Sequence, residues 1–466
     1  MAGEWRIGHL GDCVLLQSGG TPSKSRLDFW LGDVPWVSAK DMKSYWIKDT
    51  EDHLSENGAK EATRIVAQGT TLLLVRGMTL HNDIPICRVR RPAAFNQDVK
   101  AALARPGTDP EFVPYLLLGY KTKLLSIVDS AGHGTGRLNS DTLLNLPVHI
   151  PPVEEQCAIA HILGTLDEKI ELNRRMNETL EAMARAIFKS WFIDFDPVRR
   201  NAARTRNQPS PAVSRHPLPT PLPLGEARVR VPGMGEGQGE GRIKEFDALF
   251  PDHFGTSELG EIPGGWEVVT LPEVIEVNPA RSLKKGQVAP YLDMANMPSR
   301  GHSPDVVVER PFGSGMRFIN GDTLVARITP CLENGKTAFV DFLEDGQVGW
   351  GSTEYMVLRP KAPLPAVYAY CLARSGEFRE FAIQSMTGTS GRQRVPAEAL
   401  SHFLTISPPD DVAELFGRLV KPLFTRAHAA TEESRTLTAL RDTLLPKLIS
   451  GELRIRTGEK IVQAHS

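Results

Sequence analysis

Two stretches of the chain recur about 250 residues later, and this repetition limits the possible folds more than any other feature. Gly69–Arg76 reads GTTLLLVR, and its counterpart Gly321–Arg327 reads GDTLVAR. Leu143–Pro152 reads LLNLPVHIPP, and its counterpart Leu400–Pro409 reads LSHFLTISPP. The offsets, 321 − 69 = 252 and 408 − 151 = 257 residues, far exceed the ~20–50 residues of solenoid repeats. The sequence therefore predicts a duplicated domain.

Each copy of the globular part mixes short β-type runs with a short helical pattern. The β-type runs are Thr71–Val75, Val306–Val308 and Thr337–Val340, with Gly, Pro and Asn between them. Helical patterns lie near Glu111–Leu125 and Ala366–Ile383. This mixture indicates an α+β fold with a twisted sheet, but it does not fix the strand order.

After the Pro-Pro that closes each globular part, the hydrophobic period becomes that of an α-helix. From Val153 to Trp191, apolar residues recur in steps of three and four, which predicts a helix of roughly 40 residues, about 60 Å long. A second stripe begins at Val412, and Gly451 closes it. Pro422 should kink or restart this second helix, because proline lacks the amide hydrogen that helices need.

The two long apolar stripes predict how the helices are partnered. Such stripes cannot remain exposed, so we expect the helices to pack on each other as a coiled coil. A globular domain precedes each helix, which favours an antiparallel pair with a domain at each end. The expected boundaries are 1–150 and 246–407 for the globular domains, 151–199 and 408–455 for the helices, 200–245 for a linker and 456–466 for a tail.

The segment between the copies, residues 201–242, has low complexity. His216–Pro223 reads HPLPTPLP, which is typical of a polyproline spacer, and Gly233–Gly241 is nearly all Gly, Glu and Gln. Because the segment has too little apolar surface to form a core, it predicts a disordered linker.

Composition excludes few classes of function. The chain is 41% hydrophobic and has no apolar run near the ~20 residues that cross a bilayer, so no membrane partner is expected. Its five cysteines are scattered without CxxC spacing, which favours a reducing cytoplasm over a zinc site. The net charge of −2 leaves nucleic-acid binding open, because local placement of Lys and Arg decides affinity for phosphates.

Motifs for catalysis are missing from the sequence. An amino-methyltransferase would carry an aromatic residue after Pro-Pro to stack on a flipped base, but Val153 and Asp410 stand there. The chain has no GxxxxGK[ST] loop, which excludes a nucleotide-driven motor, and no HxxxH pair or acid–lysine cluster that would indicate a nuclease. We expect no catalytic and no metal-binding residues on this chain.

Binding therefore remains as the function to consider. A loop of small residues with arginine precedes each long helix: Gly132–Arg137 (GHGTGR) and Thr387–Arg394 (TGTSGRQR). Backbone N–H groups and guanidinium forks in such loops can reach phosphates and base edges, although a tight turn with solvated arginines is the alternative. The candidate DNA-binding residues are Lys40, Arg76, Arg137, Arg327, Lys336, Arg392 and Arg394.

Four strings resemble one protein family. Pro151–Ile170 is similar to the start of that family's first spacer helix, and Phe188–Pro197 (FKSWFIDFDP) to its end. Leu440–Leu453 (LRDTLLPKLISGEL) is similar to its C-terminal close, and Ser257–Pro263 (SELGEIP) to the opening of its second domain. On these strings the chain resembles the specificity (S) subunits of type I restriction-modification systems along almost its whole length, apart from the linker.

The resemblance implies two target-recognition domains that each read one half of a two-part sequence in double-stranded DNA, with the helices setting the gap. It also implies partners: modification (methyltransferase) subunits and restriction (motor-nuclease) subunits, which carry S-adenosylmethionine, ATP and Mg²⁺. No cofactor is expected on this chain. The segment 201–242 departs from the family by its greater length. A stand-alone DNA endonuclease and a coiled-coil protein adaptor remain as alternative hypotheses.

Overall fold

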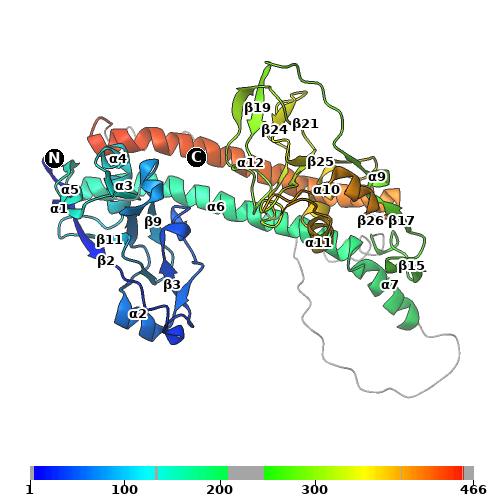
Figure 1. Cartoon of the computed structure of the whole chain (residues 1–466), viewed down its shortest axis with the longest axis horizontal. Helices are drawn as coiled ribbons and strands as arrows, with labels where there is room; N and C mark the ends of the chain where they lie inside the picture. Colours follow the sequence, from blue (N-terminus) through cyan, green and yellow to red (C-terminus); the bar gives the residue numbers. More distant parts are fainter. Residues whose placement is uncertain (1–4, 132–134, 208–245, 390, 454, 456–466) are drawn as a thin grey trace, which may run out of the picture. The chain divides into compact units, whose positions relative to one another are not determined.

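The computed structural model describes residues 5–131, 135–207, 246–389, 391–453 and 455. The chain divides into two compact units, of which unit 1 consists of Met1–Leu172 with Glu433–Ser466 and unit 2 of Asn173–Glu432. Each unit holds one globular part and a portion of both long helices, α6 (Val153–Phe192) and α12 (Asp410–Ser450), as Figure 1 shows. The C-terminal part of α12 thus belongs to the same compact unit as the N-terminal globular part.

The globular part of unit 1 is built on two main sheets. The central sheet has the order β2-β11-β7-β9-β4, with bounds Val14–Ser18, Val99–Ala104, Thr71–Leu74, Ile86–Val89 and Trp46–Ile47. A smaller sheet has the order β5-β3-β10-β6, with bounds His53–Leu54, Val34–Val37, Ala93–Phe95 and Ile65–Val66. Two further ladders pair β1 (Arg6–His9) with β14 (Pro147–Ile150), and β13 (Thr135–Arg137) with β12 (Asp129–Ala131) and β8 (Arg76–Gly77).

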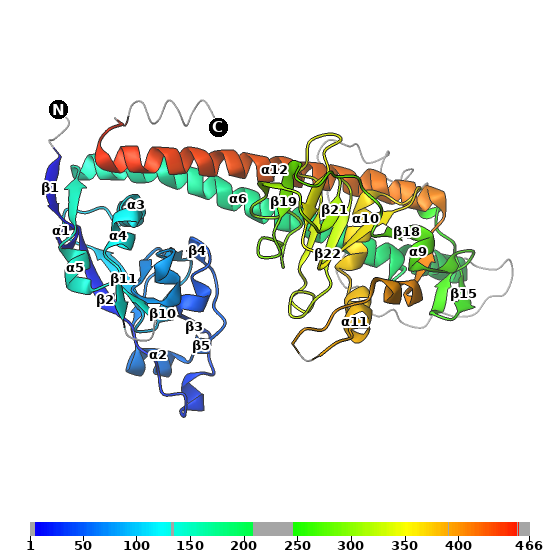
Figure 2. The same cartoon turned by 45° about the horizontal axis from the view of Figure 1, so that its top comes forward.

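Short helices connect and cover these sheets. They are α1 (Leu10–Cys13), α2 (Glu56–Ala62), α3 (Val113–Gly119), α4 (Lys121–Ser126), α5 (Ser140–Leu144) and the 3₁₀ turns η1 (Leu27–Phe29), η2 (Ala39–Asp41) and η3 (Met78–His81). In Figure 2, α3 lies between the central sheet and α6. Its Gly119 allows a close approach to α12, since a Cβ there would lie 2.8 Å from the Ile449 side chain.

Unit 2 repeats this plan. Its central sheet has the order β18-β25-β22-β23, with bounds Ile275–Val277, Tyr355–Pro360, Thr323–Ala326 and Thr337–Phe339. The smaller sheet has the order β20-β19-β24-β21, with bounds Val308–Pro311, Val288–Leu292, Gly349–Gly351 and Met316–Phe318. The remaining elements are the ladders β15 (Phe254–Ser257) with β16 (Gly260–Pro263) and β17 (Glu267–Thr270) with β26 (Leu404–Ser407), the helices α7 (Asp196–Asn207), α9 (Leu271–Val274), α10 (Ala366–Ala373) and α11 (Gly376–Gln384), and the 3₁₀ turn η5 (Ala397–His402).

The duplication predicted from the sequence is confirmed in detail. Gly69 and Gly321 both have positive φ, 83° and 86°, at the turn before β7 and β22. Their amides donate equivalent hydrogen bonds, Gly69 to the Val89 carbonyl at 2.8 Å and Gly321 to the Val340 carbonyl at 2.7 Å. Each smaller sheet also contains one parallel pair, β3 with β10 and β19 with β24. The fold is α+β, as expected.

One of the predicted β-type runs is wrong. Val306–Val308 is not a strand, because β20 begins only at Val308. β20 is an edge strand that pairs with β19 alone, and Val306 and Val308 are exposed rather than buried. Of the three residues only Val307 packs against a hydrophobic core, so the apolar run reflects a single inward-facing side chain and not a buried strand.

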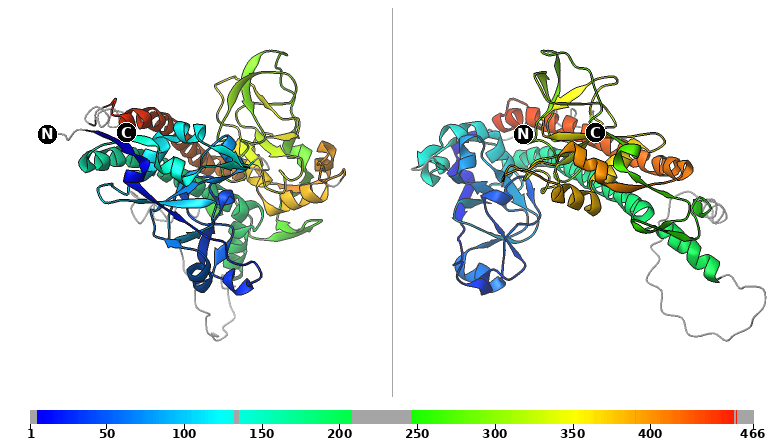
Figure 3. Two further views of the ribbon diagram at one scale, coloured as in Figure 1. Left: turned by 60° about the vertical axis from the view of Figure 1, so that its left-hand side comes forward. Right: turned by 45° about the vertical axis from the view of Figure 1, so that its right-hand side comes forward.

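The two long helices run nearly as the periodicity predicts. α6 covers 40 residues and α12 covers 41, and both can be followed in Figure 3. The expectation that Pro422 restarts the second helix is wrong, since α12 continues through it. Val420 and Phe424 are buried on either side, and the carbonyl that loses its partner belongs to the exposed Arg418, where water can bond to it. Among the described residues, no helix is long and apolar enough to cross a membrane.

The helices pack antiparallel within each unit. In unit 1, Arg441 of α12 donates to the Asp167 carboxylate of α6 at 2.8 Å. In unit 2, the Asn177 amide of α6 donates to Thr431 of α12 at 2.9 Å. A second contact in each unit, Lys169 with Glu433 in unit 1 and Phe192 with Phe416 in unit 2, lies farther along α6 and nearer the N-terminus of α12, which is the expected antiparallel direction.

The family-like string at the end of α6 forms an aromatic core in unit 2. Phe192 packs edge-on against Phe416 of α12 and Tyr368 of α10, with centroids 5.1 and 5.3 Å apart. Trp191 packs against Phe250 at 5.1 Å. Aromatic ring pairs of this kind stabilise a fold beyond what their buried area contributes. The family-like segment therefore joins the helix pair to the globular part of unit 2.

Part of the predicted disordered linker is helical. Residues 200–207 belong to α7, while residues 208–245 lie outside the described residues. The Asn201 amide donates to the carbonyls of Asp247 and Phe250, and Arg204 forms an ion pair with the buried Asp247 carboxylate. Contacts with a segment about 45 residues away thus extend the helix, which local composition cannot reveal.

We expect Arg441→Met to destabilise unit 1 by about 3–5 kcal/mol, because it leaves the Asp167 carboxylate buried without its cation. Burial raises the pKa of Asp167 even beside Arg441. A carboxyl group whose pKa is raised in the folded state takes up a proton on folding, and the protonated form needs no cation. The loss of stability caused by Arg441→Met should therefore shrink as the pH falls from 7 toward 5. Hydrogen exchange of unit 1 core amides in the full chain measures it.

The double variant Asp167→Leu/Arg441→Met is the control, because it leaves no unpaired charge. It should recover most of the lost stability. Equal losses of stability in Arg441→Met and in the double variant would show that an unpaired Asp167 charge is not what destabilises the single variant.

Candidate nucleic-acid interface

In unit 2, the loop after β22 meets the arginine-containing loop that precedes α12. Ile328 and Arg394 form an antiparallel bridge, and the Thr329 amide donates to the Gln393 carbonyl at 3.0 Å. The Val395 amide donates to the Arg327 carbonyl at 2.9 Å. Three of the predicted residues, Arg327, Arg392 and Arg394, are therefore brought to one place.

Unit 1 has the same junction. Arg76 of β8 is the cross-strand partner of Arg137 of β13. The Leu138 amide donates to the Val75 carbonyl at 2.9 Å, just as Val395 donates to Arg327 in unit 2. We call these two places the loop junctions of units 1 and 2. The junction of unit 1 unites two residues that belong to separate motifs of the sequence.

The hydrogen bonds correct the alignment of the two copies by one residue. Because Val75 and Arg327 accept the equivalent bond, Arg327 is the counterpart of Val75 and not of Arg76. Ile328 stands where unit 1 has Arg76, and Arg394 stands where it has Arg137. The first strings of the repeat differ by one residue in length, so sequence alone aligned their last arginines.

The predicted arginines differ in whether their charge is available. Arg76, Arg137 and Arg392 are exposed, and no acid among the described residues forms an ion pair with them. Arg394 is exposed but bonded to Glu354, whose carboxylate raises the pKa of the guanidinium. Guanidiniums without an acidic partner keep all five N–H donors for phosphates or base edges.

Arg327 lies in a more constrained position. Its side chain is half-buried, its amide donates to the Glu354 carbonyl at 2.9 Å, and its Nε is buried without a hydrogen-bond partner among the described residues. The backbone of Arg327 thus holds the junction of unit 2 together, while its side chain retains unused donors.

The two predicted lysines lie near equivalent positions of the two units, Lys40 by its place in the chain and Lys336 through its side-chain hydrogen bonds. Val37 of β3 and Leu292 of β19 pair in parallel with β10 and β24, so Lys40 and Ala295, each three residues later, correspond. Lys336 donates to the carbonyls of Ala295 at 3.2 Å and of Met294. Its ammonium therefore braces a turn of unit 2.

Lys40 itself is neutralised by neighbouring acids. Its Nζ lies 2.9 Å from Asp52 and 3.0 Å from Glu51, and these two hydrogen bonds raise the pKa of the lysine. Of the seven predicted residues, only Lys40 and Lys336 lie away from the loop junctions.

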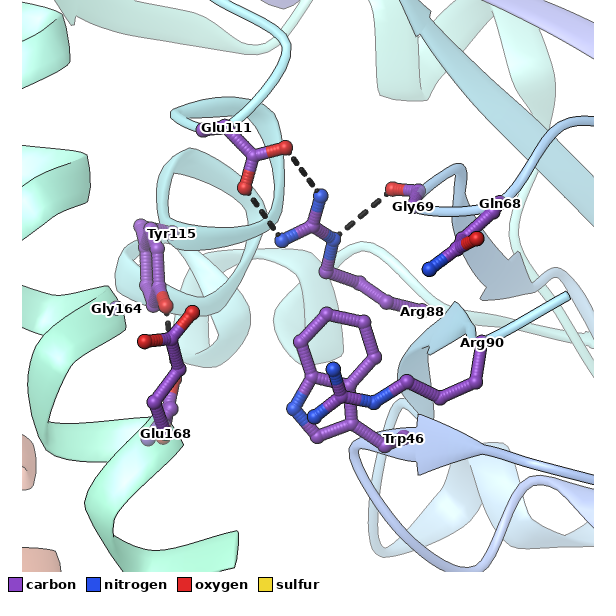
Figure 4. A pocket seen from close by; sticks show the side chains of 10 residues that line it. Trp46, Gln68, Gly69, Arg88, Arg90, Glu111, Tyr115, Gly164 and Glu168 are labelled. Carbon is purple, nitrogen blue, oxygen red and sulfur yellow. Dashed lines mark hydrogen bonds and ion pairs between the residues drawn. The ribbon is translucent and has the colours of Figure 1, made fainter. Parts of the chain in front are cut away.

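Unit 1 also contains a basic and aromatic pocket that the sequence motifs did not predict. The pocket, about 410 Å³ in volume, is shown in Figure 4. Arg90 stacks on the Trp46 ring with its guanidinium carbon 3.5 Å from the ring centroid. Arg88 is buried and makes a two-pronged ion pair with Glu111 at 2.6 and 2.7 Å. The sequence feature that could have indicated this pocket is the run CRVRRP at 87–92, because Arg88 and Arg90 alternate and so point to one face of an extended chain.

The opposite wall of this pocket comes from α6. Tyr115 donates to the buried Asp167 at 2.9 Å, and the exposed Glu168 stands beside it. Because acids line this wall, the pocket does not match a phosphate as well as the loop junctions do. Parts of both arginine-containing loops, including His133 and Ser390, lie outside the described residues.

Comparison with known proteins gives one family. Residues 2–182 match the model of the type I restriction modification DNA specificity domain. The chain is 26% identical over 97% of its length, and 94% of the relative, to the type I restriction enzyme MjaIX specificity subunit of Methanocaldococcus jannaschii. It is 26% identical over 74% of its length, and 77% of the relative, to the HindI specificity subunit of Haemophilus influenzae.

A solved structure shares the fold. The S subunit of a type I restriction-modification system from M. genitalium aligns with 96% of this chain and 96% of its own, at a TM-score of 0.52 and 13% identity. At that identity the likeness supports the architecture alone.

If Lys336 braces the turn, Lys336→Met should destabilise it by about 1.5–3 kcal/mol, because charged hydrogen bonds to two carbonyls are removed. Hydrogen exchange of the amides at 293–297 in the full chain measures this. Lys40→Met is the matched control, since exposed ion pairs contribute about 0–1 kcal/mol. Unchanged exchange in Lys336→Met would show that this lysine is not a brace and that its charge is free to bind DNA.

Proposed function

The chain belongs to the family of type I restriction-modification specificity subunits, and we propose that each of its globular domains reads one half of a two-part DNA sequence. The domains are residues 1–150 and 246–407. The observation that carries the proposal is the pair of loop junctions: the same backbone hydrogen bonds recur in both units, while the side chains around them differ. One scaffold with two different sets of side chains is what recognition of two unlike half-sites requires.

The placement of cations supports the loop junctions as the DNA-contacting surface. Arg76 and Arg137 project from paired strands, and Arg392 from the tight loop before α12. A strand backbone fixes the position from which a side chain extends, and a guanidinium group that forms no ion pair can bond to phosphates and guanine edges. Arg327 and Arg394 supply further donors in unit 2. Lys40 and Lys336 remain weaker candidates, because both are bonded within the protein.

The long helices support the rest of the assembly. In this proposal α6 and α12 set the gap between the two half-sites and bind the modification subunits, with which the restriction subunits associate. S-adenosylmethionine, ATP and Mg²⁺ act on those partners, and this chain supplies sequence preference without catalysing a reaction. We place the protein in the cytoplasm, where its five free cysteines stay reduced.

The test is DNA binding by the complex of this chain with its modification subunits. The wild-type complex should retain a small subset of genomic fragments in a gel shift. Arg76→Ala/Arg137→Ala should weaken binding and make the plot of log K against log salt less steep by roughly 0.9 for each phosphate that the variant no longer neutralises.

The charge-matched control is Arg26→Ala/Lys60→Ala, which removes two exposed cations of unit 1 that already have acidic partners. Its salt dependence should match the wild type. An equal change of slope in both double variants would contradict the assignment of Arg76 and Arg137. A wild-type complex that retains all fragments equally would contradict the proposed function.

A further inference from the structure

Each loop junction contains an acid at the same structural position. Asp98 precedes β11, and its carbonyl accepts from the Val75 amide at 2.8 Å. Glu354 precedes β25, and its carbonyl accepts from the Arg327 amide at 2.9 Å. Since Val75 and Arg327 correspond, Asp98 and Glu354 correspond too.

The turn that carries the acid is also the same in both units. The Asp98 amide donates to the side-chain oxygen of Asn96 at 3.1 Å, and the Glu354 amide donates to the side-chain oxygen of Ser352 at 3.1 Å. A side-chain acceptor two residues earlier holds each turn. Both acids are therefore fixed at the start of a central strand.

An arginine corresponds across the junction in the same way. Arg137 in unit 1 and Arg394 in unit 2 each precede the residue whose amide bonds back to Val75 or Arg327. Arg394 is held by a bridge to Thr387, with reciprocal hydrogen bonds of 2.9 Å, and by a bridge to Ile328. We call Asp98 with Arg137, and Glu354 with Arg394, the acid–arginine couples.

The couples keep their charges although their surroundings differ. Arg76 in unit 1 corresponds to Ile328 in unit 2, and Val75 corresponds to Arg327. In unit 2 the couple forms an ion pair, with Arg394 Nε 2.8 Å from Glu354 Oε1. No such ion pair joins the described atoms of the couple in unit 1. A purely structural ion pair therefore does not explain why both charges stand in both units.

The exposed atoms of the couple match the hydrogen-bonding groups of a base pair. The Glu354 side chain is 22% exposed and the Arg394 side chain 45% exposed, so both can be reached from solvent while their backbones are held in strands and bridges. Arginine bonds in two-pronged fashion to O6 and N7 of guanine, and a carboxylate accepts from N4 of cytosine. A carboxylate has about four acceptor positions and a guanidinium five donors, so each keeps capacity while bonded to the other.

We propose that each acid–arginine couple reads one G·C base pair, with arginine on guanine and the acid on cytosine, one pair in each half-site. This inference rests on the proposed function and adds the residues that determine specificity. In unit 2 the ion pair holds the Arg394 fork before DNA binds. In unit 1 the cross-strand neighbour of Arg137 on β12 is Asp129, with which it forms no ion pair, and Arg137 and the shorter Asp98 come together only on the base pair.

The experiment selects bound duplexes from a random library with the complex of the full chain and its modification subunits. Arg394→Gln should lose the preference for G·C at one position of one half-site by roughly 5- to 150-fold and favour A·T there, because glutamine pairs with adenine. Arg137→Gln should do the same in the other half-site only. Arg394→Lys should keep much of the preference, since lysine also bonds to O6 and N7 of guanine.

The acids are tested in the same selection. Glu354→Ala and Asp98→Ala should each relax preference at the same position as their arginine. Arg26→Gln, which alters an exposed ion-paired arginine elsewhere in unit 1, should change no position.

Two results would overturn the proposal. Uniform weakening at every position of a half-site, equal for Arg394→Gln and Arg394→Lys, would make the couple a structural brace. Unchanged preference in all five couple variants would show that the couples take no part in recognition. In both cases a wild-type complex that still selects a two-part sequence leaves the proposed function standing, whereas a wild type that selects no sequence overturns both.

Discussion

The packing of α6 against α12 is the interaction on which the rest of the structure depends. Each helix carries an apolar stripe that no single globular part could cover, and each unit draws on both helices. In unit 1 the packing includes a buried ion pair, Asp167 with Arg441, onto which Tyr115 of α3 also bonds. In unit 2 it includes the aromatic cluster around Phe192 and Phe416. The globular parts are thus fastened to the helix pair by side chains that also fasten the helices together.

This arrangement leaves the loop junctions free to vary. Their backbone bonds lie at the ends of central-sheet strands, so a change of an exposed side chain there costs the fold little. The units differ at the loop junctions, for example Arg76 against Ile328, and unit 1 adds β4 to its central sheet. The glycine turns and the register of the shared central strands are the same. A duplicated domain can acquire two different preferences in this way without two different folds.

The duplicated domains and the long helices could be predicted from the sequence, because repetition and apolar periodicity extend over many residues. Features that depend on contacts between distant residues could not. The 3.6-residue stripe gave α6 almost to the residue, because apolar spacing over many turns leaves few alternatives. It misjudged Pro422, because burial on both sides of an exposed proline outweighs one missing hydrogen bond. The recurring loops singled out Arg137 and Arg394 as candidates, but they gave no sign of Glu354, which lies 40 residues before Arg394 (394 − 354) and meets it only in the folded chain.

The central claim is that each unit reads its own half-site, and replacement of one unit tests it most directly. Residues 1–150 would be exchanged for the equivalent domain of another family member, and methylated adenines would be mapped across a genome carrying each version of the complex. If each unit reads its own half-site, one half of the methylated sequence should change while the other half and the gap stay the same. Methylation at unchanged sites, or a change in both halves at once, would contradict it.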